Sequence, residues 1–100
     1  MVAQTESNVI YGLSQILKER ITLANGAVEQ SNFSDYEVLR MSEVPQIHTT
    51  IVRSENRPTG IGEVELPLMG GAVSNAMFAL TGKRLRHMPF TPARVKAALA

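Results

Sequence analysis

The sequence predicts an α+β fold in which two main helices pack on a small mixed sheet. Two segments, one near each end of the chain, carry apolar residues at helical spacing. Between them lie short runs rich in β-branched residues and one Asn-Gly pair, which favour strands joined by a tight turn. With 100 residues the chain allows a single domain, spanning residues 1–100. Three short strands would make an incomplete sheet.

The first predicted helix spans residues 8–19. Serine side chains accept hydrogen bonds from first-turn N–H groups, so Ser7 is the expected N-cap. The apolar residues that predict this helix are Val9, Ile10, Leu13, Ile16 and Leu17.

A hairpin and a third strand are expected after this helix. Residues 21–23 and 27–30 would pair across Asn25-Gly26, the strongest two-residue hairpin signal. Residues 31–46 look irregular. Residues 47–52 are rich in β-branched side chains and alternate between two faces, which indicates the third strand.

The C-terminal half begins with a loop and ends with two helices. Residues 53–66 form the clearest loop in the sequence. A helix over residues 67–81 follows, with proline at its first position and Gly82 as the residue that ends it. A Thr-Pro pair predicts the cap and first position of a short helix over residues 91–100.

Composition excludes several classes of site. The formal net charge is +1, so no global field selects nucleic acid or an anionic membrane. The absence of cysteine excludes disulfides, thiolate metal sites and cysteine nucleophiles within the chain. The N-terminus lacks a signal-peptide pattern, and no apolar run approaches membrane-spanning length. A soluble, cytoplasmic protein is the resulting expectation.

The segment that could carry chemistry is Pro58-Thr59-Gly60-Ile61-Gly62-Glu63, directly ahead of a helix. Gly60 and Gly62 would allow positive φ values and a close approach to a ligand. A carboxylate ahead of a helix N-terminus is favoured in its ionised form, which is the form a general base needs. Taken alone, this pattern favours an ordinary turn and helix start.

Blocks in a fixed order carry a family resemblance from about Val2 to Val95. These blocks are Asn8–Ser14, Gly26–Met41, Gly60–Glu63, Val73–Arg86 and Met88–Val95. Together they resemble the C-terminal portion of the molybdopterin-binding large (beta) subunit of the isoquinoline 1-oxidoreductase and xanthine dehydrogenase–aldehyde oxidase family.

The resemblance implies a site and a reaction. It implies oxidative hydroxylation of an N-heteroaromatic or an aldehyde, with water as oxygen source and Glu63 as general base. Gly60, Gly62, Tyr11 and Gly12 correspond to cofactor-binding positions. The cofactor would be molybdopterin, in its cytosine dinucleotide form, with no metal ligand from the protein. It would not bind tightly to this chain alone, because the chain would be a fragment of a larger molybdopterin-binding domain.

Partners follow from the same resemblance. They are the remainder of the large subunit, a small 2Fe–2S subunit and a small-molecule substrate, with no nucleic acid and no membrane. The resemblance leaves export of the parent enzyme open. The alternative is a truncated, non-catalytic interaction module that binds a partner, or a second copy of itself, through exposed apolar helix faces.

Other residues have ordinary interpretations. His48 and His87 lack further ligands at useful spacing, so a metal role is not expected. Ser74 is interpreted as a small packing residue, and Glu65 as a solvated side chain. The basic residues among positions 83–96 are interpreted as a solvated tail rather than a nucleic-acid patch.

Overall fold

The computed structural model describes all 100 residues and contains three α-helices and one two-stranded antiparallel sheet, which confirms the α+β class. Two short 3₁₀ helices complete it. In chain order the elements are α1 (Val2–Leu17), β1 (Leu23–Ala24), β2 (Ala27–Val28), η1 (Met41–Glu43), η2 (Leu66–Leu68), α2 (Met69–Thr81) and α3 (Pro92–Leu99).

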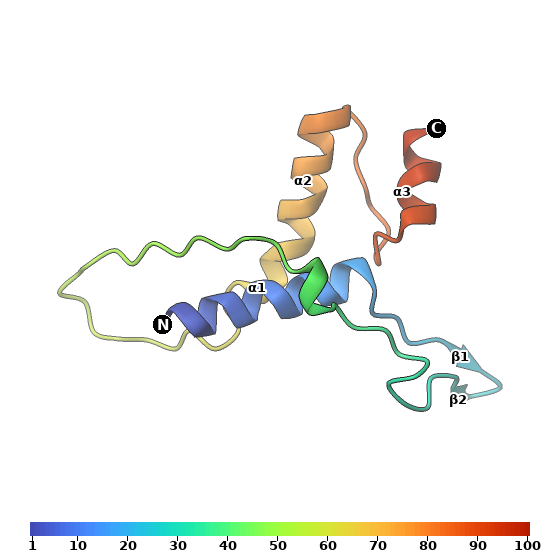
Figure 1. Ribbon diagram of the computed structural model, residues 1–100, viewed down its shortest axis with the longest axis horizontal. Coiled ribbons are helices and arrows are strands. Elements are labelled where there is room, and N and C mark those ends of the chain that lie inside the picture. Colours follow the sequence, from blue (N-terminus) through green and yellow to red (C-terminus); the bar gives the residue numbers. More distant parts are fainter.

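The helices are arranged around α1 (Figure 1). Helix α2 rises from the middle of α1, and α3 lies beside α2. The β1–β2 hairpin extends from the C-terminal end of α1, away from α2. The long connection between η1 and η2 runs out past the N-terminal end of α1 and returns. The helices therefore pack on one another, and not on a mixed sheet as the sequence suggested.

The expected third strand at residues 47–52 is wrong, because this segment forms no regular structure. A strand needs a neighbour that offers free backbone N–H and C=O groups. The only sheet lies at the opposite end of α1, so no such neighbour is within reach. Ile51 and Val52 are consequently exposed.

Helix α1 begins six residues earlier than expected. Its N-cap is Met1, whose carbonyl accepts from the N–H groups of Gln4 (3.0 Å) and Thr5 (3.1 Å). Ser7 lies inside the helix and caps nothing. Apolar periodicity begins only at Val9, but the preceding residues include good helix formers, so propensity extends the helix beyond its amphipathic part.

The buried side of α1 is mostly polar or small: Asn8, Gly12, Ser14 and Ile16. The Ser14 hydroxyl accepts a hydrogen bond from the N–H of Leu39 (2.9 Å), and the Ile16 carbonyl accepts one from the N–H of Phe90 (2.6 Å). The remaining apolar residues that predicted the helix are only half-buried: Val9, Ile10, Leu13 and Leu17. Helix α1 therefore holds its neighbours largely through hydrogen bonds.

Gly12 is the point at which α1 meets the start of α2. A Cβ atom at this position would lie 2.4 Å from Met69 Cγ and 3.0 Å from the Leu66 carbonyl oxygen. Only glycine lets the two segments approach this closely. The apolar core beside the crossing is small and consists of Ile16, Leu85 and Phe90.

The predicted hairpin is confirmed, but its strands are Leu23–Ala24 and Ala27–Val28 and not residues 21–23 and 27–30. Leu23 pairs with Val28 and Ala24 with Ala27. Both turn residues have positive φ, 51° at Asn25 and 78° at Gly26, which a two-residue turn of this kind requires.

The C-terminal helices also follow the sequence. Leu66–Leu68 forms a 3₁₀ turn that contains Pro67 and runs into α2. Helix α2 ends at Gly82, whose φ of 71° is left-handed, and Thr91 caps α3 by accepting from the N–H of Arg94. Ser74 is confirmed as a packing residue, because its buried hydroxyl donates to the Leu85 carbonyl (2.7 Å).

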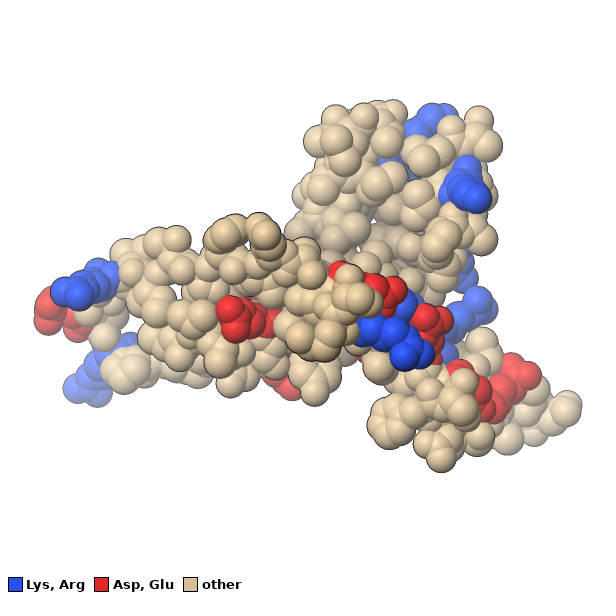
Figure 2. All heavy atoms as spheres, in the orientation of Figure 1, with Lys and Arg blue, Asp and Glu red and all other residues tan.

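Charged side chains tie the C-terminal end of α1 to η1, where Figure 2 shows both signs side by side. Lys18 Nζ lies 2.8 Å from Glu37 Oε1 and 2.7 Å from Glu43 Oε1. The hydrogen bond to Glu37, followed by that to Glu43, raises the pKa of Lys18. The hydrogen bond from Lys18 lowers the pKa of Glu43.

We expect Gly12→Ala to destabilise the protein by about 1–3 kcal/mol, because the added methyl group overpacks the crossing of α1 and α2. The midpoint of urea unfolding measures this effect. Gly71→Ala is the matched control, since a Cβ there meets nothing within 4 Å. The control should gain about 0.5–1 kcal/mol from helix propensity. A Gly12→Ala protein as stable as the control would contradict the close crossing.

Stability should also depend on the Lys18–Glu43 pair at acidic pH. Because folding lowers the pKa of Glu43, the stability that this carboxylate contributes is fully present above its ordinary pKa of 4.5 and is lost as pH falls through the lower pKa of the folded state. Glu43→Gln should therefore lower the melting temperature at pH 7, and the difference from the parent protein should shrink towards pH 3. Glu29→Gln, in the exposed hairpin, should show no such convergence. A pH-independent difference at position 43 would contradict the ion pair.

Candidate functional site

A hollow of about 260 Å³ lies between the N-terminal half of α1 and the glycine-rich loop. It contains three of the five residues that the resemblance marks as site residues. Its lining consists of Gln4, Ser7, Asn8, Tyr11, Gln15, Gly62, Glu63 and Leu66. The hollow is therefore formed by two segments that are more than forty residues apart in sequence.

Helix α1 contributes one polar face to this hollow. Gln4, Asn8, Tyr11 and Gln15 follow one another at intervals of four, three and four residues. That spacing places them in one row along a helix. The row offers amide and phenol groups, which can both donate and accept hydrogen bonds.

Two amide side chains of this row hold the loop. Asn8 is only 2% exposed, and its Nδ2 donates to the carbonyls of Gln4 (2.8 Å) and Ile61 (3.1 Å). Gln4 Nε2 donates to the carbonyl of Gly62 (3.1 Å). Successive carbonyls immediately before Glu63 are thus bound to α1, each by a hydrogen bond worth about 1 kcal/mol net.

The Oδ1 atom of Asn8 is buried and has no hydrogen-bond partner. An unsatisfied buried acceptor costs about 1–3 kcal/mol, so native proteins rarely leave one. Both hydrogens of the amide are already used, which settles the orientation of the side chain. A donor from a bound group or from further polypeptide would satisfy this atom.

The structure brings Tyr11, Gly62 and Glu63 together around the hollow. Tyr11 and Glu63 are both exposed, and Glu63 forms no ion pair. Gly60 lies outside the lining, two residues before Gly62. Gly12 is buried beneath Met69 and Leu66, so within this chain its role is packing, and a cofactor contact at Gly12 stays a prediction.

The glycines of the loop differ from expectation in one respect. Neither Gly60 nor Gly62 has a positive φ, and a Cβ at either position would meet nothing within 4 Å. The chain itself does not require glycine there. Their small size leaves open space beside the hollow, which suits the close approach of another group.

Sequence reasoning missed Asn8 and Gln4 as site residues and misjudged Glu65. The signal for the first two was the polar row from Gln4 to Gln15, which runs beside the apolar stripe of α1. Glu65 was expected to be solvated, but it is half-buried and its Oε2 atom is shielded without a partner. The reason is its place directly before η2, where the returning loop meets α1.

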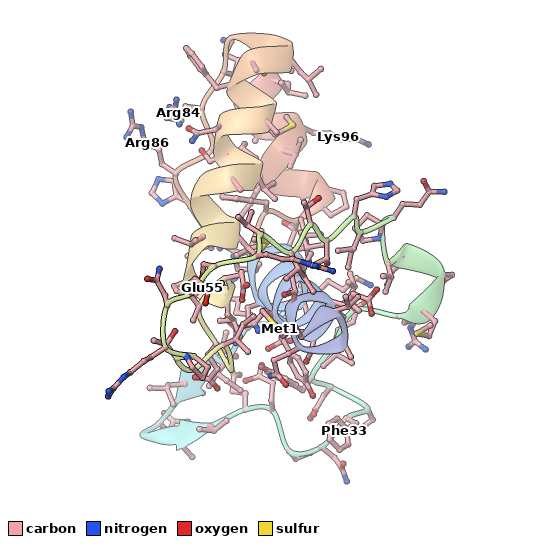
Figure 3. The ribbon with its side chains drawn as sticks, turned by 90° about the vertical axis from the view of Figure 1, so that its left-hand side faces the viewer. Met1, Phe33, Glu55, Arg84, Arg86 and Lys96 are labelled. Carbon is pink, nitrogen blue, oxygen red and sulfur yellow. The ribbon has the colours of Figure 1, made fainter.

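Neither histidine lines this hollow, and no group of three or more potential metal-ligating side chains occurs in the structure. A larger hollow of about 550 Å³ lies against α3 and contains none of the predicted site residues. Two of the arginines along it are already engaged, Arg84 with Asn75 Oδ1 (2.6 Å) and Arg94 with the Pro89 carbonyl (3.2 Å). Arg84 and Arg86 project on one side of α2 and Lys96 on the other (Figure 3), so Lys96 does not join the arginines along this hollow.

No family model matches the chain. Three curated proteins align over more than nine-tenths of it. The chain is 45% identical over 91 residues to the isoquinoline 1-oxidoreductase beta subunit of Brevundimonas diminuta. It is 38% identical over 97 residues to membrane-bound aldehyde dehydrogenase (pyrroloquinoline-quinone) of Gluconacetobacter polyoxogenes. It is 35% identical over 97 residues to a nicotinate dehydrogenase subunit of Pseudomonas putida.

The chain is therefore homologous to a segment of the isoquinoline 1-oxidoreductase beta subunit and of the nicotinate dehydrogenase subunit. The resemblance seen in the sequence is thereby confirmed. The alignments cover 91%, 97% and 96% of the chain but only 12%, 12% and 8% of the three relatives. The chain therefore corresponds to about a tenth of the length of these proteins. No helix combines the length and apolar character that crossing a membrane requires.

Proposed function

We propose that this chain is the C-terminal part of a molybdenum hydroxylase large subunit, in which Glu63 acts as the general base. The complete enzyme oxidatively hydroxylates an N-heteroaromatic or an aldehyde, with water as the source of oxygen. The observation that carries the proposal is the position of Glu63, at the rim of a polar hollow and directly after two carbonyls that α1 holds. The names of the relatives, for isoquinoline, nicotinate and aldehyde substrates, support the substrate class.

Glu63 is suited to proton transfer by its surroundings in this chain. Its side chain is exposed and unpaired, so no cation competes for the carboxylate. The backbone before it is anchored, so the carboxylate is presented from a defined point. A positioned general base contributes typically about 10²- to 10⁴-fold to the rate.

The residues of the hollow fit one edge of a polar cofactor such as molybdopterin. Tyr11 and Gln15 present polar groups, the Asn8 Oδ1 atom lacks a donor, and Gly62 leaves open space beside them. When bound, the cofactor, in its cytosine dinucleotide form, supplies the two-electron oxidation of the substrate carbon. The small hollow covers only part of such a group, so the remainder of the large subunit must hold the rest. A small 2Fe–2S subunit is the proposed electron-accepting partner.

Glu63→Gln in the complete enzyme tests this function. The amide cannot accept a proton as a carboxylate does, so kcat should fall about 10²- to 10⁴-fold. Molybdenum content should stay the same. Glu55→Gln, at the exposed tip of the long connection, is the control and should retain parental activity.

Parental activity in the Glu63→Gln enzyme would remove Glu63 from the mechanism. The cofactor is tested separately by measuring molybdenum and pyrroloquinoline quinone in the purified enzyme, because the name of one relative includes the quinone. Quinone without molybdenum would refute the proposed cofactor.

A second function, a non-catalytic interaction module, is favoured by the exposed apolar surface. Leu80 is 82% exposed, Leu68 61% and Phe78 46%, all on or beside α2. Extensive exposed apolar surface can mark interaction sites. In this alternative the chain binds a partner, or a second copy of itself, without catalysis.

Size-exclusion chromatography of the purified chain tests the exposed surface. We expect self-association, because uncovered apolar side chains favour contact between copies. Replacing Phe78 and Leu80 together by Ser should shift the chain towards the monomer. A monomeric parent chain would refute self-association through this surface, and a monomer that also binds no partner would refute the interaction module.

A further inference from the structure

We infer that the amide pair Gln4–Asn8 positions the Glu63 carboxylate, and that Asn8 is the principal member of the pair. This inference rests on the proposed role of Glu63 as a base. Helix α1 would then contribute to the reaction without contacting the substrate. Gln4 and Asn8 position Glu63 through the loop that they hold.

Peptide planarity links the loop carbonyls to the position of Glu63. The Gly62 carbonyl belongs to the same rigid unit as the nitrogen and Cα of Glu63. The hydrogen bond from Gln4 to this carbonyl (3.1 Å) therefore places the Cα atom from which the carboxylate extends. The hydrogen bond from Asn8 to Ile61 (3.1 Å) holds the preceding unit in the same way.

The amide pair provides the side-chain hydrogen bonds to this part of the loop. No other side-chain hydrogen bond reaches residues 58–64, and a Cβ at Gly60 or Gly62 would meet nothing within 4 Å. Gly62 alone gives the backbone wide freedom. Without the amide pair, the position of Glu63 would vary over several conformations.

Asn8 is the stronger anchor because of its burial. It is 2% exposed, whereas Gln4 is exposed, so water competes little for the hydrogen bond to Ile61. Its Nδ2 also donates to the Gln4 carbonyl (2.8 Å), which ties the side chain to its own helix. The bond to the Gln4 carbonyl orients the Asn8 amide, so its second N–H group is preorganised to bind the Ile61 carbonyl.

Asn8→Asp in the complete enzyme is the direct test. An aspartate has the same shape, but its ionised carboxylate only accepts hydrogen bonds and would repel the carbonyls of Gln4 and Ile61. We expect kcat to fall by up to about 100-fold, since a displacement of about 1 Å can cost that much. KM and molybdenum content should remain unchanged. Hydrogen–deuterium exchange of a peptide over residues 58–66 should become faster.

The matched control is Asn75→Asp on α2. Asn75 is exposed, lies outside the hollow and accepts from Arg84 (2.6 Å). The same chemical change there should leave both kcat and the exchange of residues 58–66 at parental values. If the Asn8 variant enzyme does not fold or accumulate in the cell, Gln4→Ala tests the inference instead, because this exposed side chain can be removed without leaving a cavity. It should lower kcat and speed exchange in the same direction.

A double variant separates positioning from a merely structural role. In the Glu63→Gln background, Asn8→Asp should cause no further loss of kcat, since there is no carboxylate left to position. An equal loss in both backgrounds would overturn the inference. Unchanged kcat, or unchanged exchange, in Asn8→Asp or Gln4→Ala would overturn it too. Parental activity in Glu63→Gln alone would instead refute the proposed base, even if exchange shows that Asn8 holds the loop.

Discussion

The hydrogen bond from the buried Asn8 amide to the Ile61 carbonyl is the contact on which the site depends. It joins the first helix to a loop fifty-three residues further along the chain. Gln4 adds a second bond one residue later. Because these bonds act on rigid peptide units, they determine the position of the Glu63 Cα atom, although neither amide hydrogen-bonds to the carboxylate.

Helix α1 binds other segments of the chain along its whole length, mostly through polar groups. Ser14 binds the backbone at Leu39, the Ile16 carbonyl binds Phe90, and Gly12 admits Met69. Hydrogen bonds of this kind need exact partners but little apolar surface. This explains how the chain holds a defined arrangement while burying only three large apolar side chains.

The cost of this design is an uncovered apolar surface. The radius of gyration is 16.3 Å, against about 13 Å for a compact domain of this length. Burying a side chain such as Leu80 or Phe78 would stabilise the protein by about 1.5–3 kcal/mol for each side chain. The chain corresponds to about a tenth of the length of its relatives. The rest of each relative is long enough to cover this apolar surface.

Local chemistry was predictable from the sequence, and long-range pairing was not. Asn25-Gly26, Gly82 and the Thr91 cap were correct because each acts through its own backbone within a few residues. The strand at 47–52 failed because β propensity cannot supply a neighbouring strand. The family resemblance predicted Glu63, Gly62 and Tyr11 as site residues. Asn8 escaped notice because its partner is set by the path of the loop, which no local pattern encodes.

A structure of the complete enzyme with its cofactor, at a resolution that separates side-chain atoms, would show whether Asn8 holds the loop that carries Glu63. We expect Asn8 Nδ2 within hydrogen-bond distance of the Ile61 carbonyl, about 2.7–3.2 Å, and the Glu63 carboxylate facing the cofactor. A loop detached from Asn8, or a Glu63 side chain directed away from the cofactor, would contradict this expectation.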